Sequence, residues 1–144
     1  MSTIIREAYT EDNIAIAELS RTALGYACED ALVRDRLAAL DKEREAVFVA
    51  ETDGIVTGFI HIERYTVLYY ETMANILGLA VSAAHRRRGI ATMLIRAAEG
   101  WAADQGIRLV RLNSGGSRSG AHEFYRSMGY KDEKMQIRSL KELR

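Results

Sequence analysis

The sequence of 144 residues has a single cysteine, no proline, no excess of charge of either sign and no long apolar run. One cysteine, Cys28, excludes an intrachain disulfide, and we expect this residue to be buried or half-buried rather than a nucleophile. Basic and acidic residues number 20 each, so the formal net charge is zero. Because nucleic-acid binders gain most of their affinity by neutralising phosphates with a basic excess, we expect no nucleic-acid partner.

Long apolar segments are also missing. No run of about 18 apolar residues is present, so no membrane-spanning helix and no membrane partner are expected. The chain starts Met-Ser-Thr-Ile-Ile-Arg-Glu, without an apolar signal segment, which favours a cytoplasmic protein. The three histidines, at positions 61, 85 and 122, show no i, i+4 pairing, so no metal site is expected.

Apolar residues make up 48% of the chain, which is enough for a sizeable core, and the length indicates one domain over residues 1–144. The apolar periodicity predicts the order β-α-α-β-β-β-α-β-α-β. Strands are expected over 3–8, 46–52, 55–64, 75–81, 108–113 and 133–139, and helices after Thr10, near 29–40, after Gly89 and over 119–128. The fold class is therefore α/β, with a mixed, predominantly antiparallel sheet flanked by helices.

Local signals support several of these boundaries. Asp53-Gly54 predicts a hairpin turn, because both central residues of a type I′ turn need positive φ. Thr10 is a candidate helix cap, because acidic residues follow it in the expected first turn. The helix after Gly89 has apolar residues at helical spacing up to Trp101, and Gly106 is expected to end it.

The stretch His-Arg-Arg-Arg-Gly-Ile-Ala, residues 85–91, lies between an apolar strand and this helix. Unpaired N–H groups and the helix dipole make such a junction favourable for anions. Gly89 lets the backbone approach an anion closely, and arginine side chains can donate charge-assisted hydrogen bonds. The pattern fits a phosphate or pyrophosphate cradle, whereas the alternative is a solvated basic turn. It is not the nucleotide-binding loop that ends in lysine and a hydroxyl residue.

The wider context of this stretch resembles a known family. Residues 79–95, Leu-Ala-Val-Ser-Ala-Ala-His-Arg-Arg-Arg-Gly-Ile-Ala-Thr-Met-Leu-Ile, are similar to the acetyl-CoA motif of the GNAT superfamily of N-acetyltransferases, with Arg86, Gly89 and Ala91 at its fixed positions. Residues 121–130, Ala-His-Glu-Phe-Tyr-Arg-Ser-Met-Gly-Tyr, resemble the family's later tyrosine-bearing helix. The expected element order is also that of the family, so the resemblance implies a GNAT-like fold.

The resemblance implies acetyl-CoA as cosubstrate and no metal. The residues expected to bind it are Leu79, Ala80, Val81, Arg86, Arg87, Arg88, Gly89, Ile90, Ala91, Thr92, Asn113, Arg118 and Tyr125. Many members have asparagine where this chain has Arg118, so contact with the cosubstrate there would be through a guanidinium. Glycine inside a strand often marks a bulge, and the family has one at Gly78, which splays two parallel strands for the thioester. The alternative for Gly78 is tight packing beneath an aromatic ring.

The same resemblance suggests Tyr125 as the general acid that protonates the departing sulfur, the alternative being a core tyrosine. Glu63 and Glu71 are candidate bases, acting directly or through water. His61 is two residues before Glu63 in the expected strand, so its side chain is expected on the same, outward face. Each is alternatively a surface group. Tyrosines 65, 69 and 70 could line an acceptor pocket or pack against the sheet.

The resemblance therefore implies an N-acetyltransferase that moves the acetyl group of acetyl-CoA to a primary amine of a small molecule or protein, by direct attack in a ternary complex. The amine acceptor is its expected partner, and a homodimer is compatible with the family. The alternative is a noncatalytic acyl-CoA sensor or regulatory module, which would need neither Tyr125 nor an acceptor cleft.

Overall fold

The computed structural model describes residues 2–114 and 119–144. The chain forms two compact units, residues 1–112 and 113–144, which are described separately. No helix in the described part is both long and apolar enough to cross a membrane.

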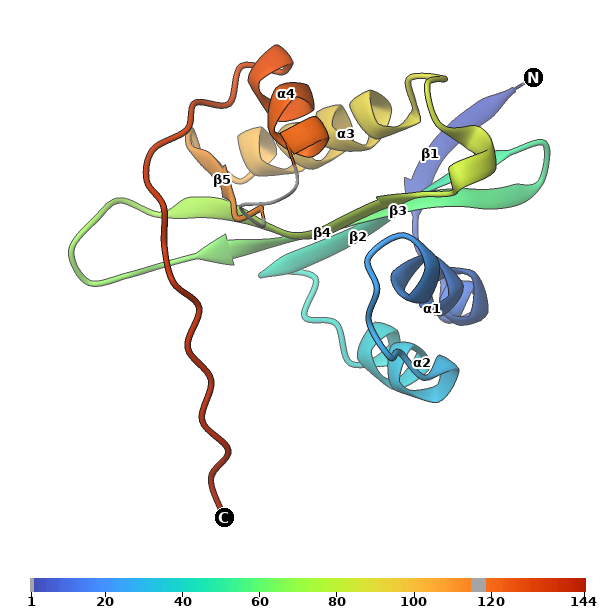
Figure 1. The fold of residues 1–144 in the computed structure, drawn as a ribbon, viewed down its shortest axis with the longest axis horizontal. Coiled ribbons are helices and arrows are strands. Elements are labelled where there is room, and N and C mark those ends of the chain that lie inside the picture. The colour runs from blue at the N-terminus through green and yellow to red at the C-terminus, as the bar shows by residue number, and fades with distance from the viewer. Residues whose placement is uncertain (1, 115–118) are drawn as a thin grey trace. The chain divides into compact units, whose positions relative to one another are not determined.

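The first unit is built on one five-stranded sheet in the order β1-β2-β3-β4-β5 (Figure 1). The strands are β1 (Thr3–Glu7), β2 (Glu45–Thr52), β3 (Ile55–Tyr65), β4 (Met73–Val81) and β5 (Val110–Leu112). The first four strands pair antiparallel with their neighbours, and only β4 and β5 run parallel. The expected mixed, predominantly antiparallel sheet is confirmed.

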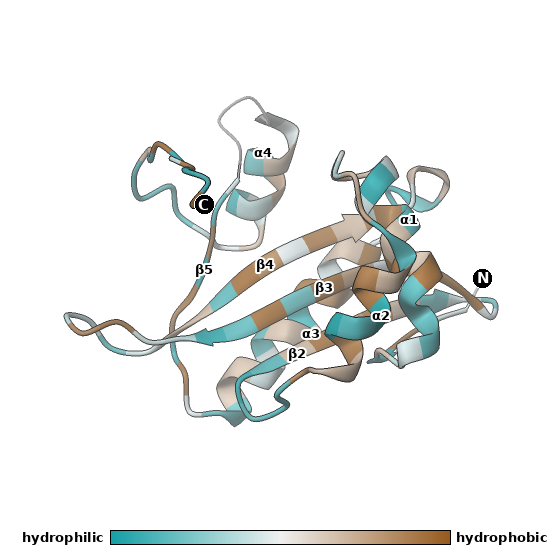
Figure 2. Ribbon diagram, turned by 90° about the horizontal axis from the view of Figure 1, so that it is seen from below, coloured by the Kyte–Doolittle hydropathy of each residue, from teal (hydrophilic) through white to brown (hydrophobic). Residues whose placement is uncertain are grey.

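Helices cover both faces of this sheet (Figure 1). The helical segments of the first unit are η1 (Thr10–Asp12), α1 (Asn13–Thr22), α2 (Asp30–Ala38), η2 (Ala83–His85) and α3 (Ile90–Asp104). Helices α1 and α2 lie on one face and α3 on the other, and Figure 2 shows hydrophobic residues along β3 and β4 between them. Residues 57–60 of β3 and 74–76 of β4 are buried in succession, as expected for central strands that helices cover on both faces.

The two faces carry separate cores. Under α1 and α2, the core includes Ile16, Leu19, Val33, Val47, Val49 and Phe59. Under α3, the buried helix residues are Ile90, Leu94, Ile95, Ala98 and Ala102. The sequence placed the helix stripe through Trp101, but the structure leaves that indole only half-buried. The buried face is therefore rotated slightly from the predicted one.

The hairpin after β2 is confirmed, because Asp53 and Gly54 have φ values of 50° and 83°. Gly106, with φ of 76°, follows the end of α3 as expected. The start of the first helix differs from expectation. Thr10 opens the 3-10 turn η1 instead of capping α1, and the Asp12 carboxylate accepts a hydrogen bond of 2.7 Å from the N–H of Tyr9.

The second unit contains one helix, α4 (Ser119–Ser127), among its described residues. The strand expected over 133–139 is wrong, since residues 130–144 have no regular secondary structure and 131–144 are exposed throughout. A strand exists only through its pairing, and no other strand pairs with this segment in the described chain. Met135 and Ile137 alternate with polar residues as a strand would, yet both are exposed.

Candidate functional site

The parallel ladder between β4 and β5 is short and ends partway along β4. Its three residue pairs are Ala74↔Val110, Asn75↔Arg111 and Ile76↔Leu112. Beyond Ile76, β4 continues to Val81 but pairs only with β3 among the described strands. The β5-facing edge of residues 77–81, which include the predicted Leu79, Ala80 and Val81, therefore carries backbone groups available to a ligand.

A bulge lies at the same point. The β3–β4 register shifts between His61 and Ile62, so that Leu77 has no partner and Gly78 lies opposite His61. A Cβ built on Gly78 would be 3.8 Å from Phe59 Cε2, an ordinary van der Waals separation. Tight packing beneath an aromatic ring therefore does not explain Gly78, whereas the expected bulge is present. Bulges bend a strand and disrupt its ladder locally, which fits the separation of β4 from β5.

The arginine stretch follows β4 and forms the turn into α3. Arg86 is extended, Arg87 has a φ of 65°, and Gly89 has a φ of 77° as the residue before the helix. Left-handed backbone at a non-glycine residue costs free energy and often occurs at functional sites. Such turns orient successive N–H groups toward one point, which makes them anion sites.

The predicted cradle residues Ile90, Ala91 and Thr92 form the first turn of α3. Their N–H groups precede the first intrahelical bond, from the Met93 N–H to the Gly89 oxygen at 3.0 Å. A Cβ on Gly89 would have no heavy atom within 4 Å, so the space in front of this backbone is open. The arginine side chains 86–88 are exposed around it, and the arrangement fits an anionic ligand.

Close packing under the cradle fixes where α3 begins. A Cβ on Gly58 would lie 3.0 Å from the Ala80 oxygen, 3.1 Å from Leu94 Cδ1 and 3.3 Å from Ile90 Cγ2. Only glycine fits there without displacement of its neighbours. Gly58 therefore lets the start of α3 approach β3 and β4, a role that the sequence analysis missed. A glycine within an apolar strand was its only signal.

A row of polar side chains lies on the sheet face that α1 and α2 partly cover. We call Glu45, His61, Glu63 and Asn75 the polar row. The strand pairs Glu45↔Glu63 and Glu63↔Asn75 place three members on one face, and His61 is two residues from Glu63 on the same strand. Because His61 lies opposite Gly78, the row runs up to the bulge.

Hydrogen bonds connect the polar row. His61 Nε2 lies 2.7 Å from Glu45 Oε1, and Asn75 Nδ2 donates to Glu63 Oε2 at 2.9 Å. Arg111 NH1 donates to Asn75 Oδ1 at 3.4 Å, and its guanidinium lies 4.7 Å from the centre of the Tyr65 ring. Glu45 and Asn75 were not predicted, since their roles depend on strand register rather than on a local motif.

The structure separates the two glutamates named as bases. Glu71 lies in the β3–β4 connection, where it is ion-paired with Arg108, whereas Glu63 lies within the sheet. Tyr69 and Tyr70 lie in the same connection and are exposed. Among the described residues, no group of three or more histidine, cysteine or acidic side chains could hold a metal ion.

The remaining predicted residues belong to the second unit. Tyr125 lies on α4, with its ring centre 5.4 Å from that of Phe124 and 6.2 Å, edge-on, from that of Tyr130. Asn113 is exposed, directly after β5. Arg118 falls outside the described residues, so its expected contact stays a prediction.

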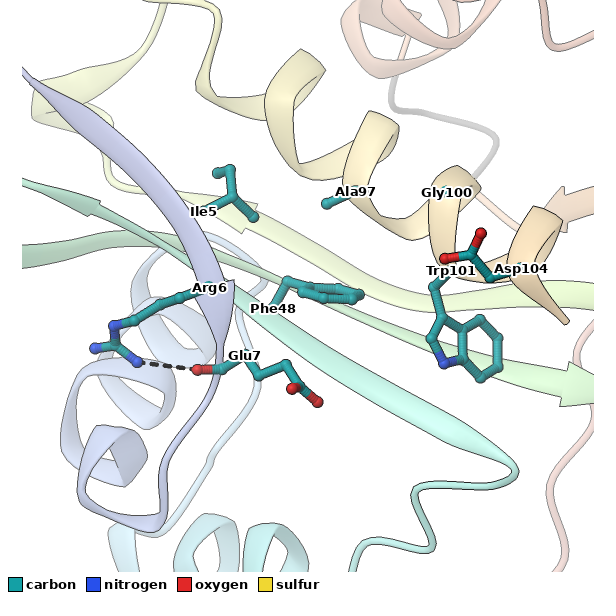
Figure 3. A pocket seen from close by; sticks show the side chains of 8 residues that line it. All are labelled: Ile5, Arg6, Glu7, Phe48, Ala97, Gly100, Trp101 and Asp104. Carbon is teal, nitrogen blue, oxygen red and sulfur yellow. Dashed lines mark hydrogen bonds between the residues drawn. The ribbon is translucent and has the colours of Figure 1, made fainter.

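A hollow of about 600 Å³ lies elsewhere in the first unit, between β1, β2 and α3. Figure 3 shows Phe48 and Ala97 at its centre, Trp101 and Asp104 on α3, and Arg6 directed away from it. None of the predicted site residues lines this hollow. It is therefore distinct from the cradle and from the bulge.

Comparison with known proteins agrees with this geometry. The sequence pattern of the Acetyltransferase (GNAT) family matches residues 13–130. An uncharacterised N-acetyltransferase of Chlorobaculum tepidum is 32% identical over 133 residues, which are 90% of this chain and 76% of the relative.

Solved structures share the fold at lower identity. A transcriptional regulator from Bacillus halodurans superposes with a TM-score of 0.85 at 22% identity, over 96% of this chain and 99% of the other. The aminoglycoside acetyltransferase AAC(6')-Iy, in complex with the bisubstrate analogue CoA-S-monomethyl-acetylneamine, also gives a TM-score of 0.85, at 20% identity, over 99% of this chain and 100% of the other. Together with the family match, these findings confirm the expected fold and enzyme class: the chain belongs to the acetyltransferase (GNAT) family and is an acetyl-CoA-dependent acetyltransferase.

Proposed function

We propose that the chain transfers the acetyl group of acetyl-CoA to a primary amine of a small molecule or protein, by direct attack within a ternary complex. The observation that carries this proposal is the end of the β4–β5 ladder at Ile76, where a bulge also shifts the β3–β4 register, in the strand that leads to the cradle. Such an interruption would give a thioester the opening that it needs to reach an amine on the other side of the strand.

The cosubstrate would be held in two places. Its pyrophosphate would contact the N–H groups of residues 87–92, with Arg86 and its neighbours as charged donors. The pantetheine amides would pair with the free edge of residues 79–81, and the N–H near Leu79 would stabilise the charge that develops on the acetyl oxygen. The orphaned Nδ1 of His85, which is buried without a partner among the described residues, supports a polar ligand nearby.

Residues 1–144 would act as one catalytic domain. The family pattern supports this, because it runs from residue 13 to residue 130 and therefore spans both compact units. Tyr125, in the second unit, would then protonate or hydrogen-bond the departing sulfur. The acceptor carries an amine, and the aminoglycoside acetyltransferases among the solved structures of this fold make aminoglycosides one class to test.

The test is a turnover assay with acetyl-CoA and a panel of polyamines, aminoglycosides, amino acids and peptides with free amino groups. Release of free thiol, together with an acetylated amine identified by mass spectrometry, would support the proposal. Tight CoA binding by calorimetry without turnover of any amine would favour the acyl-CoA sensor instead. A protein that does not bind CoA would contradict both functions.

A further inference from the structure

We propose that His61, oriented by Glu45, accepts the proton that the acceptor ammonium must lose before it attacks the acetyl group. This inference rests on the proposed function and names a base within it. An ordinary alkylamine has a pKa near that of lysine, about 10, so it reaches the site as an ammonium ion that has no lone pair. A group that removes one proton at neutral pH is therefore needed.

Position is the first argument for His61. Its backbone lies opposite Gly78, and the β3–β4 register shifts directly after it. His61 is therefore the titratable residue of the polar row that lies at the bulge. Glu63 lies two residues further along β3, opposite Asn75, and Glu71 is outside the sheet in its pair with Arg108. The histidine is the member placed closest along the strand to the opening for the thioester.

Hydrogen bonding is the second argument. His61 Nε2 lies 2.7 Å from Glu45 Oε1, and a carboxylate can only accept, so Nε2 carries a proton. Nδ1 of the neutral ring is then the basic nitrogen, and it has no hydrogen-bond partner within the described residues. The side chain is 31% exposed, which leaves this nitrogen a route to solvent. Glu45 would also stabilise the imidazolium once it forms, as a carboxylate does in catalytic triads.

The charges of the row are the third argument. Glu45 and Glu63 are directly opposite on β2 and β3, an arrangement that is unfavourable for two like charges. Each carboxylate is instead directed to its own partner, Glu45 to His61 and Glu63 to Asn75. The Glu63 carboxylate already accepts a hydrogen bond from Asn75, and its place beside His61 suits it to hold the acceptor ammonium rather than to take its proton.

The proton balance is complete with these groups. The ammonium gives one proton to Nδ1 of His61, and the neutral amine forms the new C–N bond to the acetyl carbon. The C–S bond breaks, and the second amine proton ends on the sulfur of CoA. His61 then passes its proton to solvent, so each turnover releases one proton, one amide and one CoA thiol.

The test compares His61→Gln with the wild type on two acceptors. One is an alkylamine found in the panel, and the other is its β,β,β-trifluorinated analogue, whose three fluorines withdraw enough electron density to leave the amine mostly neutral at pH 7. General-base catalysis predicts that kcat/KM falls about 100-fold or more for the alkylamine and only a few-fold for the analogue. Equal losses for the two amines would overturn the inference, since a structural defect does not distinguish them.

Further measurements complete the test. Glu45→Gln should lose activity on the alkylamine selectively, whereas Glu43→Gln, an exposed carboxylate two residues away, should not. Acetyl-CoA affinity should be unchanged in all three variants by calorimetry. Wild-type turnover in this assay tests the proposed function by itself.

NMR of the histidine nitrogens is independent of turnover. A proton on Nε2 of the neutral His61 ring supports the inference, and a proton on Nδ1 of that ring overturns it.

Discussion

Arg6 holds Asp12 with two hydrogen bonds, of 2.8 Å from NH1 and 3.0 Å from NH2, at the junction of β1 and the first helix. The Asp12 residue is only 8% exposed, and burial alone would raise the pKa of its carboxyl. The hydrogen bonds from Arg6 and from the Tyr9 N–H, with the charge of Arg6, outweigh burial and lower that pKa. Arg6 also bonds Glu51 through Nε at 3.2 Å, so the junction is a three-residue network.

This network predicts a loss of stability in acid. A carboxyl whose folded pKa is lowered contributes stability above its unfolded pKa of about 4, and the contribution disappears as the pH falls through the lower folded value. Asp12→Asn should reduce the free energy of unfolding by about 3 kcal/mol at pH 7 and flatten its pH dependence below pH 4. Urea unfolding measures both effects.

The matched control is the exposed pair of Glu18 and Arg21 on α1, joined at 2.9 Å. Glu18→Gln should change the free energy of unfolding by less than about 1 kcal/mol, as surface ion pairs do. Asp12→Asn with the same small effect would show that the junction network does not stabilise the fold.

The cradle predicts that Gly89→Ala weakens CoA binding. The φ of 77° is unfavourable for alanine, so either the backbone shifts or the added carbon enters the open space in front of the helix. Gly106→Ala is the control, because Gly106 has a φ of 76° at the other end of α3 and equally open surroundings. Both variants should lose about 1–2 kcal/mol of stability, but only Gly89→Ala should lose CoA affinity in calorimetry. If Gly89→Ala and Gly106→Ala bind CoA with equal affinity, the assignment of the cradle as the CoA site is contradicted.

The packing of α3 on the sheet predicts opposite effects of the same substitution at two glycines. Gly58→Ala should cost about 1–3 kcal/mol, because the new carbon would press on the Ala80 oxygen and on Leu94. Gly100→Ala should stabilise by about 0.5–1 kcal/mol, since Gly100 is within a helix and faces open space. Thermal unfolding gives the comparison. Weaker CoA binding by Gly58→Ala alone would link this packing to the position of the cradle.

The proposed acid predicts a selective kinetic defect in Tyr125→Phe. The ring stays, so the melting temperature should change little, while kcat should fall about 100-fold, roughly 3 kcal/mol of barrier. Tyr9→Phe is the control, an exposed tyrosine whose ring lies 4.4 Å from the Arg6 guanidinium in the first unit. A kcat near that of the wild type, with chemistry shown to limit turnover, would return Tyr125 to the role of a core residue.

Local signals predicted the parts of the fold that depend on a few neighbouring residues. The Asp53-Gly54 turn and the start of α3 at Gly89 follow from backbone preferences, so the sequence alone was enough. The strand expected over 133–139 failed because alternation shows only that a segment could pair. Whether it does pair depends on a partner strand that no local pattern specifies.

The candidate site divides in the same way. The cradle is one continuous stretch, and its motif was recognisable. The Glu45–His61 pair joins residues 16 positions apart, diagonally across two strands. It depends on a β2–β3 register that includes a shift at Ala50 and Glu51. If the β2–β3 register shifted by one residue, the Glu45 carboxylate would move to the opposite face of the sheet. Composition and sequence spacing therefore could not predict that Glu45 contacts His61.

The early end of the β4–β5 ladder at Ile76 also bears on self-association of the protein when no cosubstrate is bound. Residues 77–81 then have a hydrogen-bonding edge that no described strand pairs with, an edge that proteins usually shield, and Leu77 beside it is 50% exposed. A bound pantetheine arm would act as a substitute strand and cover that edge. Occupancy by CoA would therefore protect the protein from self-association, and the half of the sheet opened for chemistry is where aggregation of the empty form would begin.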